Sequence, residues 1–274
     1  MDTIRSTDQT PIAYWTSGSG PPLVLVHGGT ADHHRWRPVL ALLEQHRTVY
    51  AIDRRGRGGS GDRADHSLDR EFEDVAAVVR AVAERTAAPV DLLGHSYGGL
   101  CALGGARLAG DALRRLVVYE APVGPAAVLF TPDLETRLDM LVAQDRRDEA
   151  LQVFFREEVQ MPPHELAVLR GLPAWRARLA AVHTIPRELR AVVGFEPAPE
   201  WFKSIATPTL LLLGGDSSAA VTQATEHVRR HLTEAAGVRV EVMPGQQHVA
   251  IDTAPELFAR LVVEFLTSDG GTAR

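Results

Sequence analysis

Short apolar runs alternate with helical patterns along most of this chain. Six runs rich in valine, isoleucine or leucine are each closed by glycine, proline or a charged loop, which is typical of buried strands. The predicted strands cover residues 22–27, 46–53, 89–94, 113–120, 207–214 and 238–245. The segments between them favour helices at 67–84, directly after Ser96, at 222–232 and at 253–266. This alternation predicts an α/β fold with a mainly parallel central sheet flanked by helices.

Two of these helices carry N-terminal signals. Ser67 is expected to cap the helix that runs to Glu84. Thr253 and Glu256 have the three-residue spacing of a capping box, so Thr253 is expected to cap the last helix.

One long segment interrupts the alternation. Between about residues 122 and 207 we find no strand pattern but four helical ones, at 133–144, 148–159, 163–170 and 175–183. This segment is too long for a loop. It predicts a helical lid inserted after the strand at 113–120. The core domain would then be formed by 1–124 and 205–274, and the cap by 125–204.

The composition and charge of the chain limit the classes of binding partner that are expected. The net charge of −6 disfavours nucleic acid and anionic membranes, which both need a basic face. No signal-peptide pattern and no apolar run of membrane-spanning length is visible, so a cytoplasmic protein, monomeric or homodimeric, is expected. The single cysteine, Cys101, excludes an intramolecular disulfide and is interpreted as a buried apolar residue.

The stretch Gly94-His95-Ser96-Tyr97-Gly98 carries the strongest chemical signal. It fits G-x-S-x-G, and it follows an apolar strand and precedes a helix. In this context the serine sits on a sharp turn that exposes its hydroxyl, while the glycines let strand and helix approach. Ser96 is therefore the expected nucleophile. The backbone N–H groups of Tyr97 and of Gly29, in the loop "HGGT", are the expected oxyanion donors, and His27 is expected to hold that loop by hydrogen bonding.

A serine needs a base, and the chain has 11 histidines. His248 follows the last predicted strand and precedes the final helix, which places it at the carboxyl edge of the sheet. It is the expected base, and His183 in the lid is a second candidate. The elbow is expected to turn His95 away from Ser96. The others are interpreted as surface residues: His33, His34, His46, His66, His164, His227 and His231.

Two carboxylates could orient the histidine. Glu120 and Asp216 both follow predicted strands and both satisfy the order serine, acid, histidine. At this point the chain resembles the α/β-hydrolase fold superfamily, through "HGG", "DRRGRGGSG", "GHSYGG", the helical insertion, "LLLLGGD" and the terminal histidine loop. The resemblance covers nearly the whole chain.

The resemblance also bears on the acid. In many members the acid stands three residues past the glycine that ends the seventh strand, and that position here holds Ser217. In a branch resembling haloalkane dehalogenases the acid follows the sixth strand, which corresponds to Glu120. Glu120 also follows four apolar residues, so it is expected to be partly buried and to need a partner. We favour Glu120 and keep Asp216 as the alternative.

The remaining candidates concern the pocket. Thr30, Phe154, Trp175, His183 and Val249 are expected to line it. Arg54, Arg55 and Arg57 are expected to pair with Asp53 and Asp62 and so hold a loop. No metal-ligand spacing or phosphate-binding loop is present, so neither a metal nor another cofactor is expected.

The expected function is hydrolysis of a carboxylic ester or lactone of a medium-sized, fairly apolar small molecule through an acyl-enzyme. A serine at the elbow argues against relatives that open epoxides or displace halide, because those use an aspartate there. Amide or iminopeptide cleavage, a lyase reaction and cofactor-free oxygenation remain alternatives within the same fold, and a non-catalytic small-ligand receptor is another.

Overall fold

A computed structural model describes residues 1–124, 133–159, 161–172, 174–232 and 237–268. Its sheet has eight strands in the order β1-β2-β4-β3-β5-β6-β7-β8, and neighbours from β4 to β8 pair in parallel. The strands are β1 (Asp2–Arg5), β2 (Pro11–Gly18), β3 (Pro22–Val26), β4 (Thr48–Ile52), β5 (Val90–His95), β6 (Leu113–Tyr119), β7 (Thr209–Gly214) and β8 (Val238–Met243). The predicted α/β fold with a mainly parallel sheet is confirmed.

Two strands lie outside the sequence prediction. β1 pairs antiparallel with β2, and β2 pairs antiparallel with β4. β1 is mostly exposed, so it lacks the continuous apolar run by which the buried strands were predicted.

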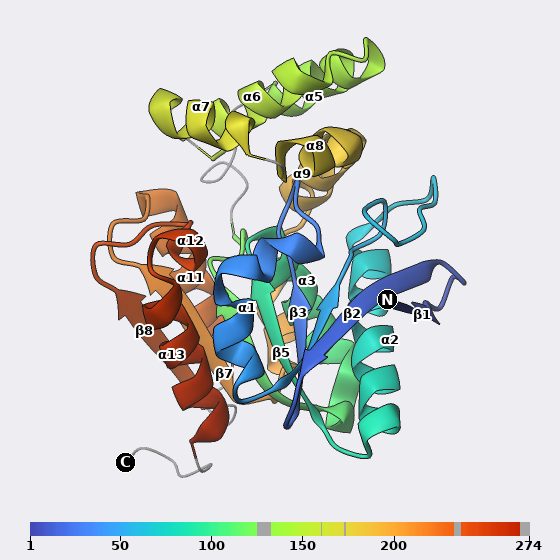
Figure 1. The fold of residues 1–274 in the computed structure, drawn as a ribbon, viewed down its shortest axis with the longest axis vertical. Helices are drawn as coiled ribbons and strands as arrows, with labels where there is room; N and C mark the ends of the chain where they lie inside the picture. The colour runs from blue at the N-terminus through green and yellow to red at the C-terminus, as the bar shows by residue number, and fades with distance from the viewer. Residues whose placement is uncertain (125–132, 160, 173, 233–236, 269–274) are drawn as a thin grey trace.

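Helices cover both faces of the sheet (Figure 1). On one face α2 packs against α3, and on the other α1 packs against α13. The helices outside the insertion are α1 (Arg37–Glu44), α2 (Leu68–Thr86), α3 (Tyr97–Ala109), α11 (Ala219–His231), α12 (Ala250–Thr253) and α13 (Pro255–Thr267), with the short 3-10 helices η1 (His33–Trp36) and η2 (Gly110–Ala112).

The two capping predictions have different outcomes. The Ser67 side chain accepts a hydrogen bond from the Arg70 N–H and caps α2, as predicted. Thr253 does not cap α13, because it ends α12, and its hydroxyl donates to Gln246 Oε1 at 2.7 Å. α13 instead begins at Pro255, whose fixed φ suits the first turn of a helix.

The insertion between β6 and β7 is helical, as predicted. It contains α5 (Leu134–Ala143), α6 (Arg147–Glu157), α7 (Pro163–Gly171), α8 (Ala174–Ala181), η3 (Val182–Thr184), α9 (Ile185–Val193) and α10 (Pro199–Lys203). α9 and α10 were not predicted. We call α5 to α9 the cap helices, because their buried side chains form a hydrophobic cluster of their own, whereas Phe202 of α10 packs into the core. The division into two domains stays a prediction, and its boundary at residue 125 lies outside the described residues.

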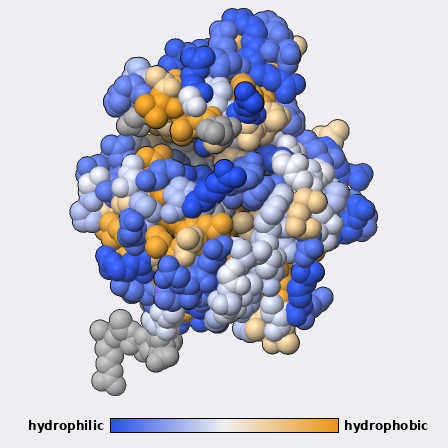
Figure 2. Space-filling model, viewed as in Figure 1, coloured by the Kyte–Doolittle hydropathy of each residue, from blue (hydrophilic) through white to orange (hydrophobic). Residues whose placement is uncertain are grey.

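The cap helices lie above the carboxyl edge of the sheet (Figure 1). Figure 2 shows hydrophilic residues over the top of this cap and hydrophobic residues along its lower edge, toward the core. Within the described part of the chain, we find no helix with the length and apolarity needed to cross a bilayer.

Candidate active site

Ser96 lies on a strained turn between β5 and α3. Its φ of 56° and ψ of −131° are unfavourable for a residue with a side chain, and such strain typically costs about 1–3 kcal/mol. A Cβ on Gly94 would lie 2.4 Å from the Gly98 carbonyl oxygen, and one on Gly98 would lie 2.3 Å from that of His27. Both glycines are therefore needed for the close approach of strand, helix and neighbouring loop.

Gly28 contacts the serine directly. A Cβ added to Gly28 would lie 2.9 Å from Ser96 Cβ and 3.4 Å from Ser96 Oγ. The loop after β3 therefore lies against the elbow, and any larger residue at this position would displace it. The contact of Gly28 with Ser96 was not predicted from the sequence, which pointed only to Gly29 as an oxyanion donor. The paired glycines of "HGG" could have indicated both.

His27 holds this loop, as predicted. Its Nδ1 lies 2.8 Å from the Gly28 carbonyl oxygen, and its Nε2 accepts the Arg54 backbone N–H at 3.1 Å. Burial, reinforced by the charges of Arg54 and Arg57, holds the pKa of His27 well below its usual value. The ring is thus neutral with its proton on Nδ1, the tautomer that satisfies both hydrogen bonds.

His248 meets Glu120 at the carboxyl edge. His248 Nδ1 lies 2.6 Å from Glu120 Oε2, and the Glu120 side chain is fully buried while that of His248 is 29% exposed. Glu120 follows β6 with a φ of 51° and His248 follows β8, so two strand ends bring the pair together. The arrangement fixes the tautomer of His248 and leaves its Nε2 free of this contact.

The second carboxylate oxygen of Glu120 is also bound. Oε1 accepts the Gly214 N–H at 2.8 Å and the Ser217 hydroxyl at 2.6 Å. Ser217 stands at the position where the family resemblance implied an acid, and here it donates to the acid that follows β6. Asp216 is exposed, and its backbone N–H donates to the Gln246 carbonyl.

His95 and Tyr119 hold the loop that carries His248 by hydrogen bonds to its backbone. His95 Nε2 lies 3.1 Å from the His248 carbonyl oxygen, and the two imidazole rings are 4.7 Å apart. Tyr119 donates its hydroxyl proton to the Gln247 carbonyl and accepts the Ala250 N–H at 3.1 Å. Burial, together with the charge of His248, holds the pKa of His95 well below its usual value, so His95 acts as a neutral donor. Its contact with the His248 loop was missed, because it depends on residues 153 positions apart.

The two residues expected to supply oxyanion donors lie at the start of α3 and in the loop after β3. Tyr97 is the first residue of α3, so its N–H belongs to the unpaired N-terminal turn of a helix. Its ring lies beneath Arg54, whose guanidinium carbon is 4.2 Å from the ring centre. A Cβ on Gly29 would lie 3.6 Å from Glu188 Oε2 and 3.9 Å from Phe154 Cζ, so Gly29 faces the cap helices.

The arginine cluster has other partners than predicted. Arg54 pairs with Glu71 and with Glu188 of α9, and Arg57 pairs with the same Glu188. The predicted pairing with Asp53 and Asp62 is therefore wrong, because buried carboxylates from α2 and the cap helices lie closer. Arg55 pairs with Asp74 and Asp8. Asp53 contacts His33, and Asp62 contacts Arg187 and His183.

Glu188 therefore links the cap to the core beside Gly29, in the loop after β3. Its carboxylate accepts from Arg54 Nη2 at 2.7 Å and also from Arg57 Nη2, and all three side chains are at most 5% exposed. His66 likewise departs from its interpretation as a surface residue, since its side chain is 4% exposed and its Nε2 lies 3.2 Å from Glu71. Cys101 is buried, as predicted, and burial raises its pKa.

The five residues expected to line the pocket lie in different places. Thr30 is buried and its hydroxyl accepts a hydrogen bond from Arg178, Phe154 faces Gly29, and Val249 lies beside His248. Trp175 is packed in the cap cluster and donates to Asp148 at 2.8 Å. His183 is 42% exposed and lines a cavity of about 360 Å³ that lies between α8 and the two segments 31–32 and 56–62.

The cap also contains a half-buried acid that was not expected from the sequence. Glu158 follows α6 one turn after Phe154, and its N–H donates to the Phe154 carbonyl at 2.9 Å. Its Oε2 is buried and has no hydrogen-bond partner among the described residues. Burial raises the pKa of Glu158 to about 8, so its carboxyl is protonated near neutral pH.

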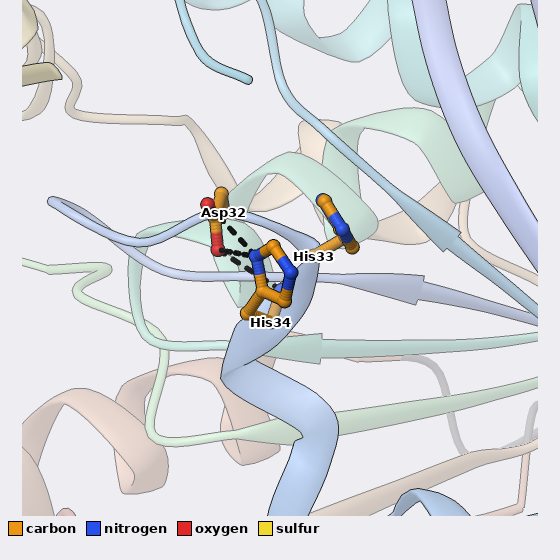
Figure 3. Close-up of side chains that lie close together, drawn as sticks. All are labelled: Asp32, His33 and His34. Atoms are coloured by element: carbon orange, nitrogen blue, oxygen red, sulfur yellow. Dashed lines mark hydrogen bonds and ion pairs between the residues drawn. The ribbon is translucent and has the colours of Figure 1, made fainter. Parts of the chain in front are cut away.

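Within the described residues one cluster has the composition of a metal site: Asp32, His33 and His34 (Figure 3). Its groups have partners within the chain. Asp32 caps η1 by accepting the His34 N–H at 2.9 Å and also contacts His34 Nδ1 at 3.2 Å. His33 Nδ1 lies 2.8 Å from Asp53, and its ring stacks on Trp15. Helix capping and ring packing account for this cluster.

Residues 23–261 match the model of the Alpha/beta hydrolase family. The chain belongs to this family. The α/β-hydrolase fold implied by the sequence resemblance is therefore confirmed, including the helical insertion between β6 and β7.

Individual members of the family resemble this chain over most of its length. A 2-(acetamidomethylene)succinate hydrolase from Mesorhizobium japonicum is 26% identical over 270 residues, which cover 91% of this chain and 89% of the relative. A pimeloyl-[acyl-carrier protein] methyl ester esterase from Methylococcus capsulatus is 27% identical, covering 92% and 97%. A crystal structure of an alpha/beta hydrolase from Sphaerobacter thermophilus is 36% identical, with a TM-score of 0.81 over 97% of this chain and 100% of that one.

Proposed function

We propose that this protein hydrolyses a carboxylic ester or lactone of a small molecule, with Ser96 as nucleophile, His248 as base and Glu120 as the acid that orients it. The observation that carries the proposal is the 2.6 Å contact between His248 Nδ1 and Glu120 Oε2, at the same sheet edge as the strained Ser96 turn. The related hydrolases include methyl ester esterases, which act on the same kind of bond. Phe154 facing Gly29 supports a partly apolar binding space for the substrate.

The reaction runs through an acyl-enzyme. Ser96 Oγ attacks the carbonyl carbon and its proton passes to His248 Nε2, while the N–H groups of Gly29 and Tyr97 stabilise the oxyanion. The C–O bond to the leaving group then breaks, and His248 gives the proton to the departing alkoxide. A water attacks the acyl-enzyme with His248 again as base, which releases the carboxylic acid and restores the serine hydroxyl.

Glu120 has a positioning role in this scheme. It holds His248 with the proton on Nδ1 and stabilises the positive charge that the ring gains in each step. The Gly214 N–H and the Ser217 hydroxyl fix the carboxylate on its other oxygen, so it cannot rotate away from the histidine.

The test is turnover of a short p-nitrophenyl ester by wild type and Ser96→Ala. We expect hydrolysis by wild type and a fall in kcat on the order of 10⁶ in the variant, because a serine hydrolase without its nucleophile keeps only its binding and oxyanion contributions. An active Ser96→Ala protein, free of contaminating esterase, would contradict the proposal. Binding of a small ligand without turnover by the wild type would favour a receptor.

A further inference from the structure

Arg178 of α8 is a largely buried cation with few partners. Its side chain reaches the loop after β3 and donates from Nη1 to the hydroxyl of Thr30. Its Nε is buried and has no hydrogen-bond partner among the described residues. Nor does any carboxylate in the described part of the chain form an ion pair with this guanidinium, whereas Arg54 and Arg57 are paired with Glu188.

A guanidinium that is removed from water without an ion-pair partner is energetically unfavourable unless a ligand binds to it. A guanidinium carries five N–H donors, and a buried charge is normally paired because removing it from water costs several kcal/mol in effective terms. Burial, with a contribution from nearby Arg35, lowers the pKa of Arg178 to about 10, so it keeps its charge at neutral pH. Asp252 and Asp32 offset part of this charge from a distance, but among the described residues no carboxylate forms an ion pair with the guanidinium.

The place is beside the proposed chemistry. Thr30 directly follows Gly29, and in Figure 1 the loop after β3 reaches up toward α8. The charge of Arg178 also contributes to lowering the pKa of His95, the residue before Ser96. The ring of Phe155 lies 5.4 Å from the guanidinium carbon and supports the side chain from the cap.

We propose that Arg178 binds a carboxylate of the substrate, so that the natural substrates are esters or lactones that carry a free carboxylate. This inference rests on the ester hydrolysis proposed above and refines the fairly apolar molecule expected from the sequence. The guanidinium presents a planar pair of donors that matches a carboxylate. Phe154 faces the oxyanion loop and supplies the apolar contact for the linker.

Thr30 connects Arg178 with the proposed oxyanion donor, because it directly follows Gly29 and its hydroxyl contacts the guanidinium. The carboxylate of the substrate therefore binds on the cap side of the loop after β3. Half-esters of short dicarboxylic acids are the simplest molecules that carry both the ester and the carboxylate.

The test compares two esters that differ in one charge. Monomethyl glutarate and dimethyl glutarate share the reacting group, and their hydrolysis is followed by pH-stat titration. We expect Arg178→Met to lower kcat/KM for monomethyl glutarate about 10- to 100-fold, mainly through KM, and to change kcat/KM for the diester by less than about threefold. Arg178→Lys is expected to recover part of the loss, because it keeps the charge and loses the planar fork.

Arg176 provides the matched control, since it lies on the same helix but is exposed. Arg176→Met is expected to leave the ratio of kcat/KM values for the two esters unchanged. Equal losses for both esters in Arg178→Met would show a merely structural role and overturn the inference. Full activity of Arg178→Met on both esters would overturn it as well.

A binding measurement separates this inference from the proposed function. Titration of Ser96→Ala with glutarate by calorimetry needs no turnover, and we expect binding that Arg178→Met in the same background weakens at least 10-fold. If wild type hydrolyses neither ester but this binding is found, the proposed function fails and the carboxylate site stands. If the diester is hydrolysed through Ser96 and glutarate binding does not depend on Arg178, the function stands and the carboxylate site fails.

Discussion

Replacing Glu120 with glutamine tests the proposed acid with little change in shape. A glutamine has one acceptor oxygen where Glu120 uses two, toward His248 on one side and toward Gly214 and Ser217 on the other. Turning the amide oxygen toward His248 would place its NH₂ against the Gly214 N–H. That buried N–H would lose its partner, at a cost of about 1–3 kcal/mol.

The amide NH₂ of the variant is therefore expected to face His248. His248 Nδ1 must then accept a hydrogen bond, which places the ring proton on Nε2 and removes the base that Ser96 needs. A comparable change in a serine protease lowers kcat by about 10⁴, and we expect a loss of this order for Glu120→Gln. The assay is kcat for a p-nitrophenyl ester, with circular dichroism to show that the fold is retained.

Two matched variants make this test specific. Asp216→Asn is expected to lower kcat less than about tenfold, because Asp216 is exposed and Glu120 already contacts the histidine. Ser217→Ala removes one of the two donors to Oε1 and is expected to cost about 1 kcal/mol, or roughly tenfold at most. A loss near 10⁴ in Asp216→Asn with a near-normal Glu120→Gln would refute the assignment.

Three further results are expected. Glu188→Gln should lower the free energy of unfolding by about 3 kcal/mol or more, because it leaves two buried arginines without their shared carboxylate; a chemical denaturation curve like that of wild type would contradict this. The pKa of Glu158 is raised to about 8, so its contribution to stability is lost between about pH 4.5 and 8, where the unfolded carboxyl is ionised and the folded one is not. The free energy of unfolding of Glu158→Gln relative to that of wild type should therefore rise by about 1 kcal/mol or more between pH 5 and 8, and a difference that is the same at both pH values would argue against it. Gly28→Ala should lower kcat about 100-fold by displacing the loop from Ser96, whereas Gly171→Ala, with open space around it, should not.

The sequence was informative where function depends on local geometry. The turn around Ser96 could be predicted because G-x-S-x-G, the apolar strand before it and the helix after it are contiguous. Glu120 could be favoured because it follows a buried strand and stands between Ser96 and His248 in the order that the parallel sheet requires.

Contacts between the cap and the core could not be predicted in the same way. Glu188 and Arg54 are 134 residues apart in the sequence, and Arg178 and Thr30 are 148 apart. The local pattern of hydrophobic and polar residues does not indicate either contact. The partners assumed for the arginine loop were neighbours in sequence, whereas buried acids from α2 and α9 are neighbours in space. β1 was missed for a different reason, since a mostly exposed edge strand has no hydrophobic run.

Intact-mass spectrometry detects the proposed acyl-enzyme at Ser96 directly. Wild type is mixed with a p-nitrophenyl ester, quenched with acid during turnover, and digested to locate any modification. We expect the protein to gain the mass of the acyl group less one hydrogen, on the peptide that contains Ser96, and Ser96→Ala to gain nothing. Steady hydrolysis with no acyl adduct on wild type, or with the adduct on another residue, would contradict it.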